Sequence, residues 1–346
     1  MGSFGWRGAG RRGGRGDRSV SGGLYRRRPG WPTIAAGSHS GLFCVATRPG
    51  SIGFGPVGRP GPLQSGRSAP HGATATPMTH HVEDTRVIEP AASIYNATLV
   101  RREDQTDDLA SFWVKLDGEP VHFEPGQYLT IGVIVDGKLL QRPYSVASAP
   151  QASGTDGYEF YVRLVPVIRF TTALWRLPIG HQMRMIGPKG RFLLDPGDDR
   201  THLYVSTGTG IAPFISMIRD TMARGDERKT VVLHGCSFVD ELGYREYLEG
   251  LEQDGAYPLT YVPTISRPND PRNDGWTGRR GRAEHVVADV CEDLGLRPER
   301  TVVYICGNPD MILNVEHELM HRGFPEFHVK KELYWPKGKD AALKAG

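Results

Sequence analysis

The stretch Ser206–Thr–Gly–Thr–Gly–Ile–Ala–Pro–Phe214 decides how this chain folds. The apolar run that ends at Ser206 has the length of a buried strand, and a turn containing Gly208 and Gly210 follows it. Pro213 suits the first turn of a helix, where its missing N–H costs no hydrogen bond. Such a turn lets backbone N–H groups approach a pyrophosphate at the positive end of a helix. The stretch therefore predicts a nucleotide-binding unit, with an ordinary strand–helix turn as the alternative.

Downstream of Arg200 the sequence alternates apolar strands with helical stretches. This alternation is typical of βαβ units and predicts a parallel sheet, so we assign residues 198–335 to a nicotinamide-nucleotide α/β domain. The expected strands are His202–Ser206, Thr230–His234, Leu259–Ile265, Thr301–Cys306 and Glu326–Leu333.

Upstream, residues 88–197 contain six short β-rich runs separated by turn signals such as Asp136–Gly137. Short strands at this density predict a small antiparallel six-stranded barrel. The runs are Ser93–Val100, Leu109–Leu116, Gln127–Val135, Tyr144–Ser148, Tyr158–Leu164 and Gln182–Ile186.

Residues 1–77 differ from the rest, because they hold 11 Arg and 19 of the 44 Gly but only one acid, Asp17. This composition cannot bury enough apolar surface to fold, so we predict a disordered leader. A translation start at Met78 would make the leader non-native. The functional alternatives are a transit peptide, an RNA-binding Arg–Gly tract and a secretion signal. Residues 336–346 are expected to form a C-terminal tail.

The formal charge of +3 averages two unlike parts of the chain. Without the leader, 31 basic residues face 38 acidic ones, a net of −7, so nucleic-acid binding is not expected. No run of apolar residues is long enough for a transmembrane helix. The four scattered cysteines have no metal-site spacing, and we expect no metal, reduced thiols and a cytoplasmic location.

Two further motifs carry chemistry. Arg142–Pro–Tyr–Ser145 is expected at the start of a barrel strand, where Arg supplies donors for phosphate oxygens and Tyr a flat face for a flavin. Cys306–Gly–Asn–Pro–Asp–Met311 again joins a strand to a helix, with Gly307 permitting close approach of a ligand and Asn308 able to cap the helix. Taken singly, each motif is weak: a structural Arg with a barrel-core Tyr is the alternative for the first, and a buried strand-end thiol for Cys306 in the second.

Together, Arg142–Ser145, Gly208–Pro213 and Cys306–Pro309 stand in an order and spacing that resemble the ferredoxin–NADP reductase superfamily, over roughly residues 90–335. The resemblance implies a barrel that binds FAD and a second domain that binds NADP(H).

The resemblance also implies roles for single residues. Arg142 would contact the FAD phosphates, Tyr144 would lie against the flavin, and Ser145 would sit near flavin N5. Thr171 and Thr172 stand where the family places a second FAD phosphate contact. The remaining nucleotide-binding residues would be Thr207, Gly208, Thr209, Gly210 and Gly307, with Thr209 and Cys306 flanking the nicotinamide.

The end of the chain resembles the terminal Glu-x-Tyr of plant-type reductases, with Glu332 and Tyr334 in the matching positions. In that family Tyr covers the flavin and Glu helps to position the reacting groups. Here Trp335 and the tail follow, which leaves open whether Tyr334, Trp335 or neither stacks on the flavin. A final strand with an exposed aromatic end is the plain alternative.

The choice between NADP and NAD rests on charge. NAD sites often place an acid near the ribose 2′-hydroxyl, but no acid directly follows His234–Ser237 at the end of the second strand. We expect a 2′-phosphate to bind Ser237, Arg267 and one of the arginines that follow, which are Arg272, Arg279, Arg280 and Arg282. Asp240 and Glu241 count against this choice, and a solvated basic loop is the alternative.

The predicted activity is hydride exchange between NADPH and FAD, followed by single-electron transfer with ferredoxin or flavodoxin. Ser145, Cys306 and Glu332 are the expected catalytic residues. The alternatives are the reductase component of an oxygenase and a non-catalytic flavin subunit that relays electrons.

Overall fold

The computed structural model describes residues 94–255 and 257–333. The predictions for residues 1–77, for the tail 336–346 and for Tyr334 and Trp335 fall outside these described residues. Within them, no helix has both the length and the apolar character needed to cross a membrane.

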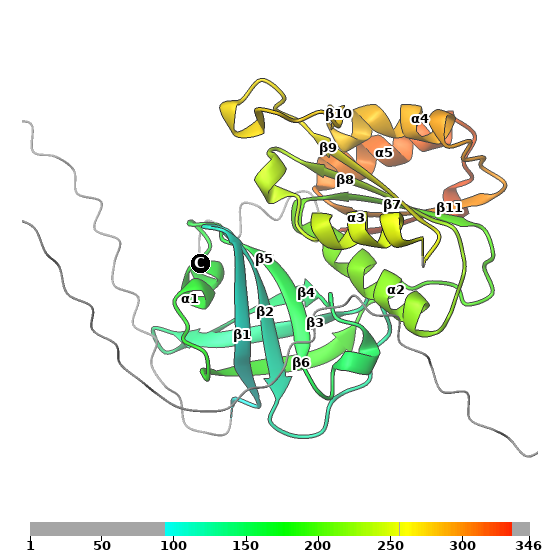
Figure 1. Cartoon of the computed structure of the whole chain (residues 1–346). Coiled ribbons are helices and arrows are strands. Elements are labelled where there is room, and N and C mark those ends of the chain that lie inside the picture. Colours follow the sequence, from blue (N-terminus) through cyan, green and yellow to red (C-terminus); the bar gives the residue numbers. More distant parts are fainter. Residues whose placement is uncertain (1–93, 256, 334–346) are drawn as a thin grey trace, which may run out of the picture. The chain divides into compact units, whose positions relative to one another are not determined.

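The first domain is an antiparallel six-stranded sheet in the order β4-β3-β6-β1-β2-β5 (Figure 1). An antiparallel bridge between Val146 and Phe160 joins its two ends, so the sheet closes into a barrel. Its strands are β1 (Ala97–Thr106), β2 (Leu109–Leu116), β3 (Tyr128–Val135), β4 (Lys138–Ser145), β5 (Tyr158–Arg163) and β6 (Gln182–Lys189). The short helices are η1 (Pro150–Ala152), after β4, and α1 (Arg169–Trp175), between β5 and β6.

Four of the six predicted barrel strands overlap most of an observed strand, the first overlaps only the start of β1, and the fourth prediction was wrong. Strand β4 is Lys138–Ser145 rather than Tyr144–Ser148, because Asp136 and Gly137 both have positive φ (50° and 74°) and turn the chain straight back. Val135 then pairs with Lys138. As a result, the Arg142–Ser145 motif ends a strand instead of starting one.

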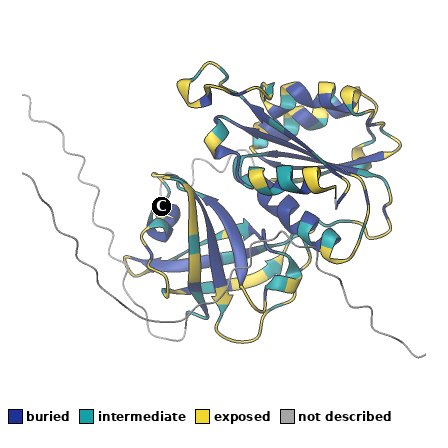
Figure 2. Cartoon of the chain, in the orientation of Figure 1, coloured by how far each residue is buried: buried dark blue, intermediate teal, exposed yellow. Residues whose placement is uncertain are grey.

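The barrel core consists of alternate strand residues, such as Leu129, Ile131 and Val133 of β3. Buried residues are dark blue along the strands in Figure 2. Burying each large apolar side chain contributes about 1.5–3 kcal/mol, so this layer is the main stabilising feature of the domain. Helix α1 adds Phe170, Ala173 and Leu174 to the same core. The largest fully buried side chains of the barrel core include Phe112, Phe123, Tyr158 and Phe160.

The second domain is a six-stranded sheet in the order β10-β9-β8-β7-β11-β12, with every adjacent pair parallel. This confirms the predicted α/β domain. Its strands are β7 (Thr201–Thr207), β8 (Thr230–Cys236), β9 (Leu259–Ile265), β10 (Arg279–Arg280), β11 (Thr301–Gly307) and β12 (Val329–Leu333). The two-residue β10 was not predicted, and β12 begins later than predicted because Glu326–His328 form a short 3₁₀ helix, η5.

Helices cover both faces of this sheet (Figure 1). Helices α2 (Ala212–Ala223) and α3 (Arg245–Asp254) pack on one face, and α4 (Ala283–Asp293) and α5 (Pro309–His321) on the other. Strands β8 and β9 continue to one side of β7, whereas β11 lies on its other side. The strand order therefore reverses between β7 and β11, and ligands of parallel sheets bind beyond the carboxyl ends of strands at such a point.

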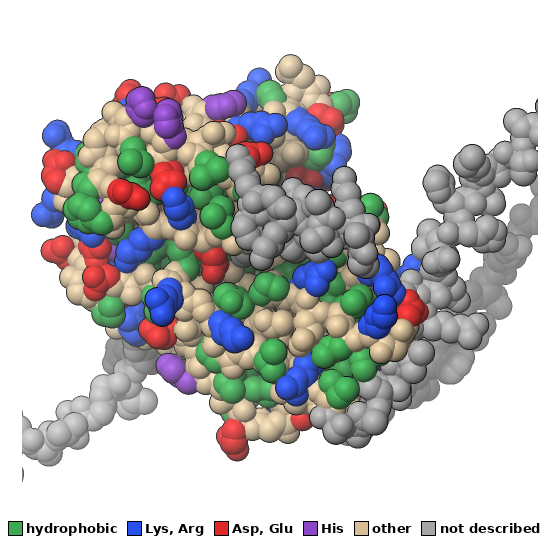
Figure 3. Space-filling model, turned by 180° about the vertical axis from the view of Figure 1, so that it is seen from behind, with side chains coloured by type: hydrophobic (Ala, Val, Ile, Leu, Met, Phe, Trp, Pro, Cys, Tyr) green, Lys and Arg blue, Asp and Glu red, His purple; other side chains and the backbone are tan. Residues whose placement is uncertain are grey.

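The surface carries mixed charge. On the face drawn in Figure 3, Lys and Arg side chains are interspersed with Asp and Glu side chains.

Candidate functional site

Two turns meet at the strand reversal. The turn after β7, η2 (Gly208–Ile211), packs directly on the end of β11. A Cβ added to Gly210 would lie 2.4 Å from the Cys306 carbonyl oxygen, and one added to Gly307 (φ 140°) would lie 2.4 Å from the Thr207 hydroxyl. Both positions require glycine, because the neighbouring atoms are too close for any side chain.

Gly208 serves a different purpose. It has a positive φ of 51°, and a Cβ added there would meet no atom within 4 Å. The turn is therefore open on this side, at the positive end of α2, where an anion is favoured. The open side belongs to a pocket of about 610 Å³ whose lining includes Thr207, Gly208, Thr209, Gly210, Ser237, Arg267, Arg282, Gly307 and Asn308.

Asn308 caps the start of α5, as predicted. Its side-chain oxygen accepts hydrogen bonds from the backbone N–H groups of Asp310 and Met311, at 2.9 and 3.2 Å. Its own N–H donates to the Thr207 hydroxyl at 3.0 Å. The cap thus holds the start of α5 against the end of β7, and so fixes the floor of the pocket.

A second, smaller pocket of about 150 Å³ lies between the barrel and the glycine turn. The barrel supplies the Arg142–Ser145 motif, and the α/β domain supplies Thr209 and Ala212. Residues predicted to touch the flavin and one predicted to touch the nicotinamide thus line a single space. Its other lining residues are Tyr161, Arg163, Val165, Ile168 and Thr171.

Arg142 is prepared for a ligand in this pocket. One terminal nitrogen donates to the Gln141 carbonyl at 2.8 Å, but the buried Nε finds no hydrogen-bond partner among the described residues. A buried donor without a partner costs about 1–3 kcal/mol. A phosphate oxygen would remove that cost, so this residue fits the FAD phosphate contact.

Tyr144 packs against the aromatic rings of Phe160 and Phe170, with ring centroids 6.5 and 5.9 Å away. Burial raises the pKa of its hydroxyl well above the ordinary value, and the Arg142 charge only partly opposes this. The ring is thus a neutral, fixed surface, as a flavin-stacking residue requires.

The two threonines of α1 already use their hydroxyls. Thr171 Oγ1 donates to the Val165 or Ile168 carbonyl at 3.0 or 3.1 Å, and Thr172 Oγ1 lies 3.2 Å from the Ile168 carbonyl. Thr171 lines the smaller pocket, whereas Thr172 is not among its lining residues. A phosphate contact by either would use the backbone N–H or require the hydroxyl to change partner.

Ser145 and Glu332 meet across the domains. The Ser145 hydroxyl donates to the Glu332 carboxylate at 3.0 Å. Burial raises the pKa of Glu332 to about 7, while the Ser145 hydrogen bond acts in the opposite direction. Cys306 is fully buried and lies beside Glu332 in the register of β11 and β12. The three predicted catalytic residues therefore gather at one place.

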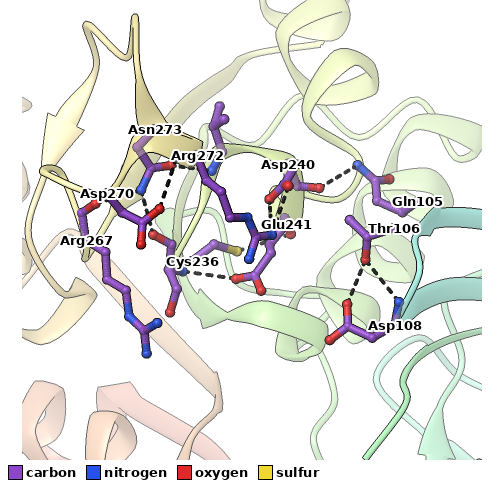
Figure 4. A network of polar contacts seen from close by, with 12 residues as sticks. Gln105, Thr106, Asp108, Cys236, Asp240, Glu241, Arg267, Asp270, Arg272 and Asn273 are labelled. Carbon is purple, nitrogen blue, oxygen red and sulfur yellow. Dashed lines mark hydrogen bonds and ion pairs between the residues drawn. The ribbon is translucent and has the colours of Figure 1, made fainter. Parts of the chain in front are cut away.

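Figure 4 shows the region predicted to bind a 2′-phosphate. The Ser237 N–H donates to the Glu241 carboxylate at 3.3 Å, and Glu241 also pairs with Arg163 at 3.0 Å. The Arg267 guanidinium extends away from this network and makes no ion pair within the described part of the chain; it lies 5.1 Å from the Phe238 ring centroid.

The other arginines of this region divide into two groups. Arg272 binds both Asp240 oxygens, Arg279 pairs with Asp293, and Arg280 donates to the Trp276 carbonyl. None of the three lines the nucleotide pocket. Arg282 does line it, and its nearest carboxylate oxygen, on Glu284, is 3.8 Å away. Arg267 and Arg282 therefore remain as the candidates for a phosphate.

Comparison with known proteins agrees with this geometry. Residues 96–193 match the family model of the oxidoreductase FAD-binding domain, and residues 204–317 match that of the oxidoreductase NAD-binding domain. Ferredoxin–NADP reductase B of Sorangium cellulosum is 33% identical over 64% of this chain and 88% of its own length. The chain belongs to the ferredoxin–NADP reductase family. This reductase is thus an NAD(P)H-dependent flavin oxidoreductase that transfers electrons, with FAD- and NAD-binding domains.

One further relative belongs to a phenol hydroxylase, and one solved structure shows the same fold. The phenol hydroxylase P5 protein of Acinetobacter pittii is 29% identical over 75% of this chain and 71% of its own length. A crystal structure of a ferredoxin–NADP⁺ reductase from Neisseria gonorrhoeae with bound FAD and NADP has a TM-score of 0.61 at 23% identity, covering 70% of this chain and all of that one. The second likeness confirms the predicted two-domain fold.

Sequence reasoning missed two residues of this reductase site. Arg163 lines both pockets and pairs with Asp108 and Glu241. Tyr161 is buried, and its hydroxyl has no hydrogen-bond partner within residues 94–255 and 257–333. Both lie on β5 without any motif, so no signal in a single sequence distinguishes them from ordinary barrel residues. Among the described residues, no group of three or more metal-ligating side chains lies together.

Proposed function

We propose that this reductase is a ferredoxin–NADP reductase, which exchanges hydride between NADPH and FAD and passes single electrons to or from ferredoxin or flavodoxin. FAD supplies the step from two-electron to one-electron chemistry. The chain's own residues bind the two cofactors, hold their rings together and exclude water. The reductases named among its relatives support the choice of carrier.

The proposed roles follow the pockets. Arg142 holds the FAD phosphates through its unpartnered Nε, with Thr171 and Thr172 at the start of α1 as the second contact. Tyr144 would lie against the flavin and Ser145 would sit near its N5 atom, since both residues line the smaller pocket. Glu332 orients the Ser145 hydroxyl and holds or releases a proton near neutral pH. Cys306 would lie next to the nicotinamide, behind the glycine turns, because its fully buried side chain lines neither pocket. The residues that hold the rest of the nucleotide are Thr207, Gly208, Thr209, Gly210 and Gly307.

One observation carries the preference for NADPH. The guanidinium of Arg267 lines the nucleotide pocket and has no carboxylate partner in the described part of the chain, whereas Arg272 and Arg279 are already paired. A 2′-phosphate would give Arg267 a charge-assisted hydrogen bond, and Ser237 beside it supplies a hydroxyl. NADH has only a neutral hydroxyl at the ribose 2′ position, so it would not give Arg267 this charged partner.

Steady-state kinetics test the carrier. Purified reductase loaded with FAD should reduce a bacterial ferredoxin or flavodoxin with NADPH, at a higher kcat/KM than with NADH. A rate with both carriers no faster than that with dissolved oxygen alone would contradict the proposal.

A second candidate is the reductase component of an oxygenase, which the likeness to the phenol hydroxylase P5 protein favours. The cysteines of residues 1–346 do not form the Cys-x₄-Cys-x₂-Cys spacing of a plant-type ferredoxin domain. An oxygenase would therefore receive electrons through a ferredoxin outside these residues. The third interpretation, a non-catalytic electron relay, predicts that the isolated chain does not oxidise NADPH.

A further inference from the structure

Helix α2 leads directly from the glycine turn of the nucleotide site. The same helix also touches the segment that follows the flavin motif. The Ser216 hydroxyl donates to the Ser148 carbonyl at 2.8 Å, and Arg219 donates to the Ala147 carbonyl at 2.9 Å. Gln151 donates to the Asp220 carboxylate at 2.8 Å. Ala147 comes two residues after Ser145, the last residue of β4. These contacts therefore connect the nucleotide turn, Gly208–Ile211, to β4, here called the flavin strand because it carries Arg142–Ser145.

Arg219 makes the strongest of these contacts. The nitrogen that binds the Ala147 carbonyl also pairs with the Glu159 carboxylate on β5. Its guanidinium lies over the rings of Tyr244 and Tyr247, at 5.6 and 5.4 Å from their centroids. A lysine could replace the charge but not the planar fork or the stacking.

Glu159 depends on Arg219. This carboxylate is only 3% exposed and also accepts hydrogen bonds from the Tyr244 and Ser111 hydroxyls, at 2.7 and 3.2 Å. Tyr244 adopts a positive φ of 59°, which is unfavourable for a residue other than glycine and persists only where surrounding contacts enforce it. The network therefore joins β2, β5, α2 and the start of α3 into one connected unit.

Hydride transfer needs two rings held at close, fixed distance, and a displacement of about 1 Å costs on the order of a hundredfold in rate. Here one ring would be held by the turn before α2 and the other by the strand before Ala147. We propose that Arg219 is a positioning residue that sets the distance between the nicotinamide and flavin sites by fastening α2 to the flavin strand. This inference rests on the proposed hydride exchange.

The test compares Arg219→Met with Arg322→Met, a surface arginine on the C-terminal side of α5 that also contacts two carboxylates, Glu292 and Glu318. Stopped-flow flavin reduction by NADPH should slow about ten- to hundredfold in Arg219→Met and stay within about twofold in Arg322→Met. The charge-transfer absorbance of the stacked nicotinamide and flavin rings should weaken in Arg219→Met alone.

Two readouts separate positioning from general damage. Affinity for 2′,5′-ADP, which lacks the nicotinamide, and FAD content should both match the wild type in Arg219→Met. A wild-type reduction rate and charge-transfer band in that variant would overturn the inference while leaving the proposed function standing. A wild type whose flavin neither NADPH nor NADH reduces would overturn both.

A gentler variant keeps the test decisive if Arg219→Met loses FAD. Arg219→Lys keeps a positive charge near Glu159 and removes the planar fork that reaches both Glu159 and the Ala147 carbonyl. It should slow flavin reduction severalfold with unchanged FAD content and 2′,5′-ADP affinity. Unchanged reduction in Arg219→Lys would then overturn the inference.

Discussion

The Ser145 hydroxyl and the Glu332 carboxylate form a 3.0 Å hydrogen bond although they belong to different domains. Ser145 is the last residue of β4, and Glu332 lies in β12, next to Cys306 in the sheet. The bond brings a titratable group from the end of the described chain to the flavin motif. Because burial raises the pKa of Glu332 to about 7, its charge changes near physiological pH.

Replacing Glu332 by Gln keeps the shape and removes the charge. We expect pre-steady-state flavin reduction by NADPH to slow at least about tenfold, equivalent to about 1.4 kcal/mol of barrier, with FAD binding intact. The physical reason is loss of the titratable group, because the Gln amide oxygen can still accept from the Ser145 hydroxyl but the amide can neither carry the charge nor exchange a proton near neutral pH. Reduction and ferredoxin turnover at wild-type rates would show that the charge of Glu332 has no part in the reaction.

The same substitution has a pH signature in stability. The pKa of Glu332 is raised from 4.5 to about 7 in the folded protein, so folding favours the protonated form. Its stabilising contribution is present below about pH 4.5 and is lost as the pH rises through 7. Relative to wild type, Glu332→Gln should therefore gain stability between pH 5 and pH 8. Urea unfolding of both proteins at those two pH values measures this, and a constant difference would show that the pKa is not raised.

Arg267→Ala tests the 2′-phosphate site. Loss of one charge-assisted contact costs about 1.5–3 kcal/mol, so the KM for NADPH should rise roughly 10- to 150-fold while that for NADH hardly changes. Arg279→Ala is the matched control, because Arg279 pairs with Asp293 and does not line the pocket. An equal rise in the KM for NADPH and for NADH in Arg267→Ala would show that Arg267 does not bind the 2′-phosphate.

Gly210→Ala tests the packing of the two turns. The new Cβ would lie 2.4 Å from the Cys306 carbonyl, so the backbone must shift. Overpacking of this kind costs about 1–3 kcal/mol, and we expect weaker 2′,5′-ADP binding as well. Gly250→Ala in α3, where the added Cβ meets nothing, should instead raise the free energy of unfolding by about 0.5–1 kcal/mol. Equal stability of both variants in urea would contradict the described packing.

The sequence was most informative where periodicity and motifs coincide. The central parallel strands β7, β8 and β11 were predictable because each is a buried apolar run, and the glycine turn because Gly208 and Pro213 lie at a strand–helix junction. Strand β4 was not, because Lys138 and Pro143 interrupt its alternation at the edge of the sheet. The catalytic group was expected only through family resemblance.

Other contacts were beyond the reach of a single sequence. The pairing of Arg219 with Glu159 depends on how α2 packs against β5, and nothing near either residue indicates it. The same holds for Arg267, which is one of five nearby arginines until the structure shows that Arg272 and Arg279 have carboxylate partners.

Anaerobic titration of the purified, FAD-loaded protein shows whether this chain passes hydride between a nicotinamide nucleotide and its own flavin. We predict a yellow protein whose visible flavin absorbance is bleached by a stoichiometric amount of NADPH, with NADH less effective, and restored by oxidised ferredoxin. A colourless protein that takes up no added FAD, or a bound flavin that stays oxidised with excess NADPH and NADH, would contradict this prediction.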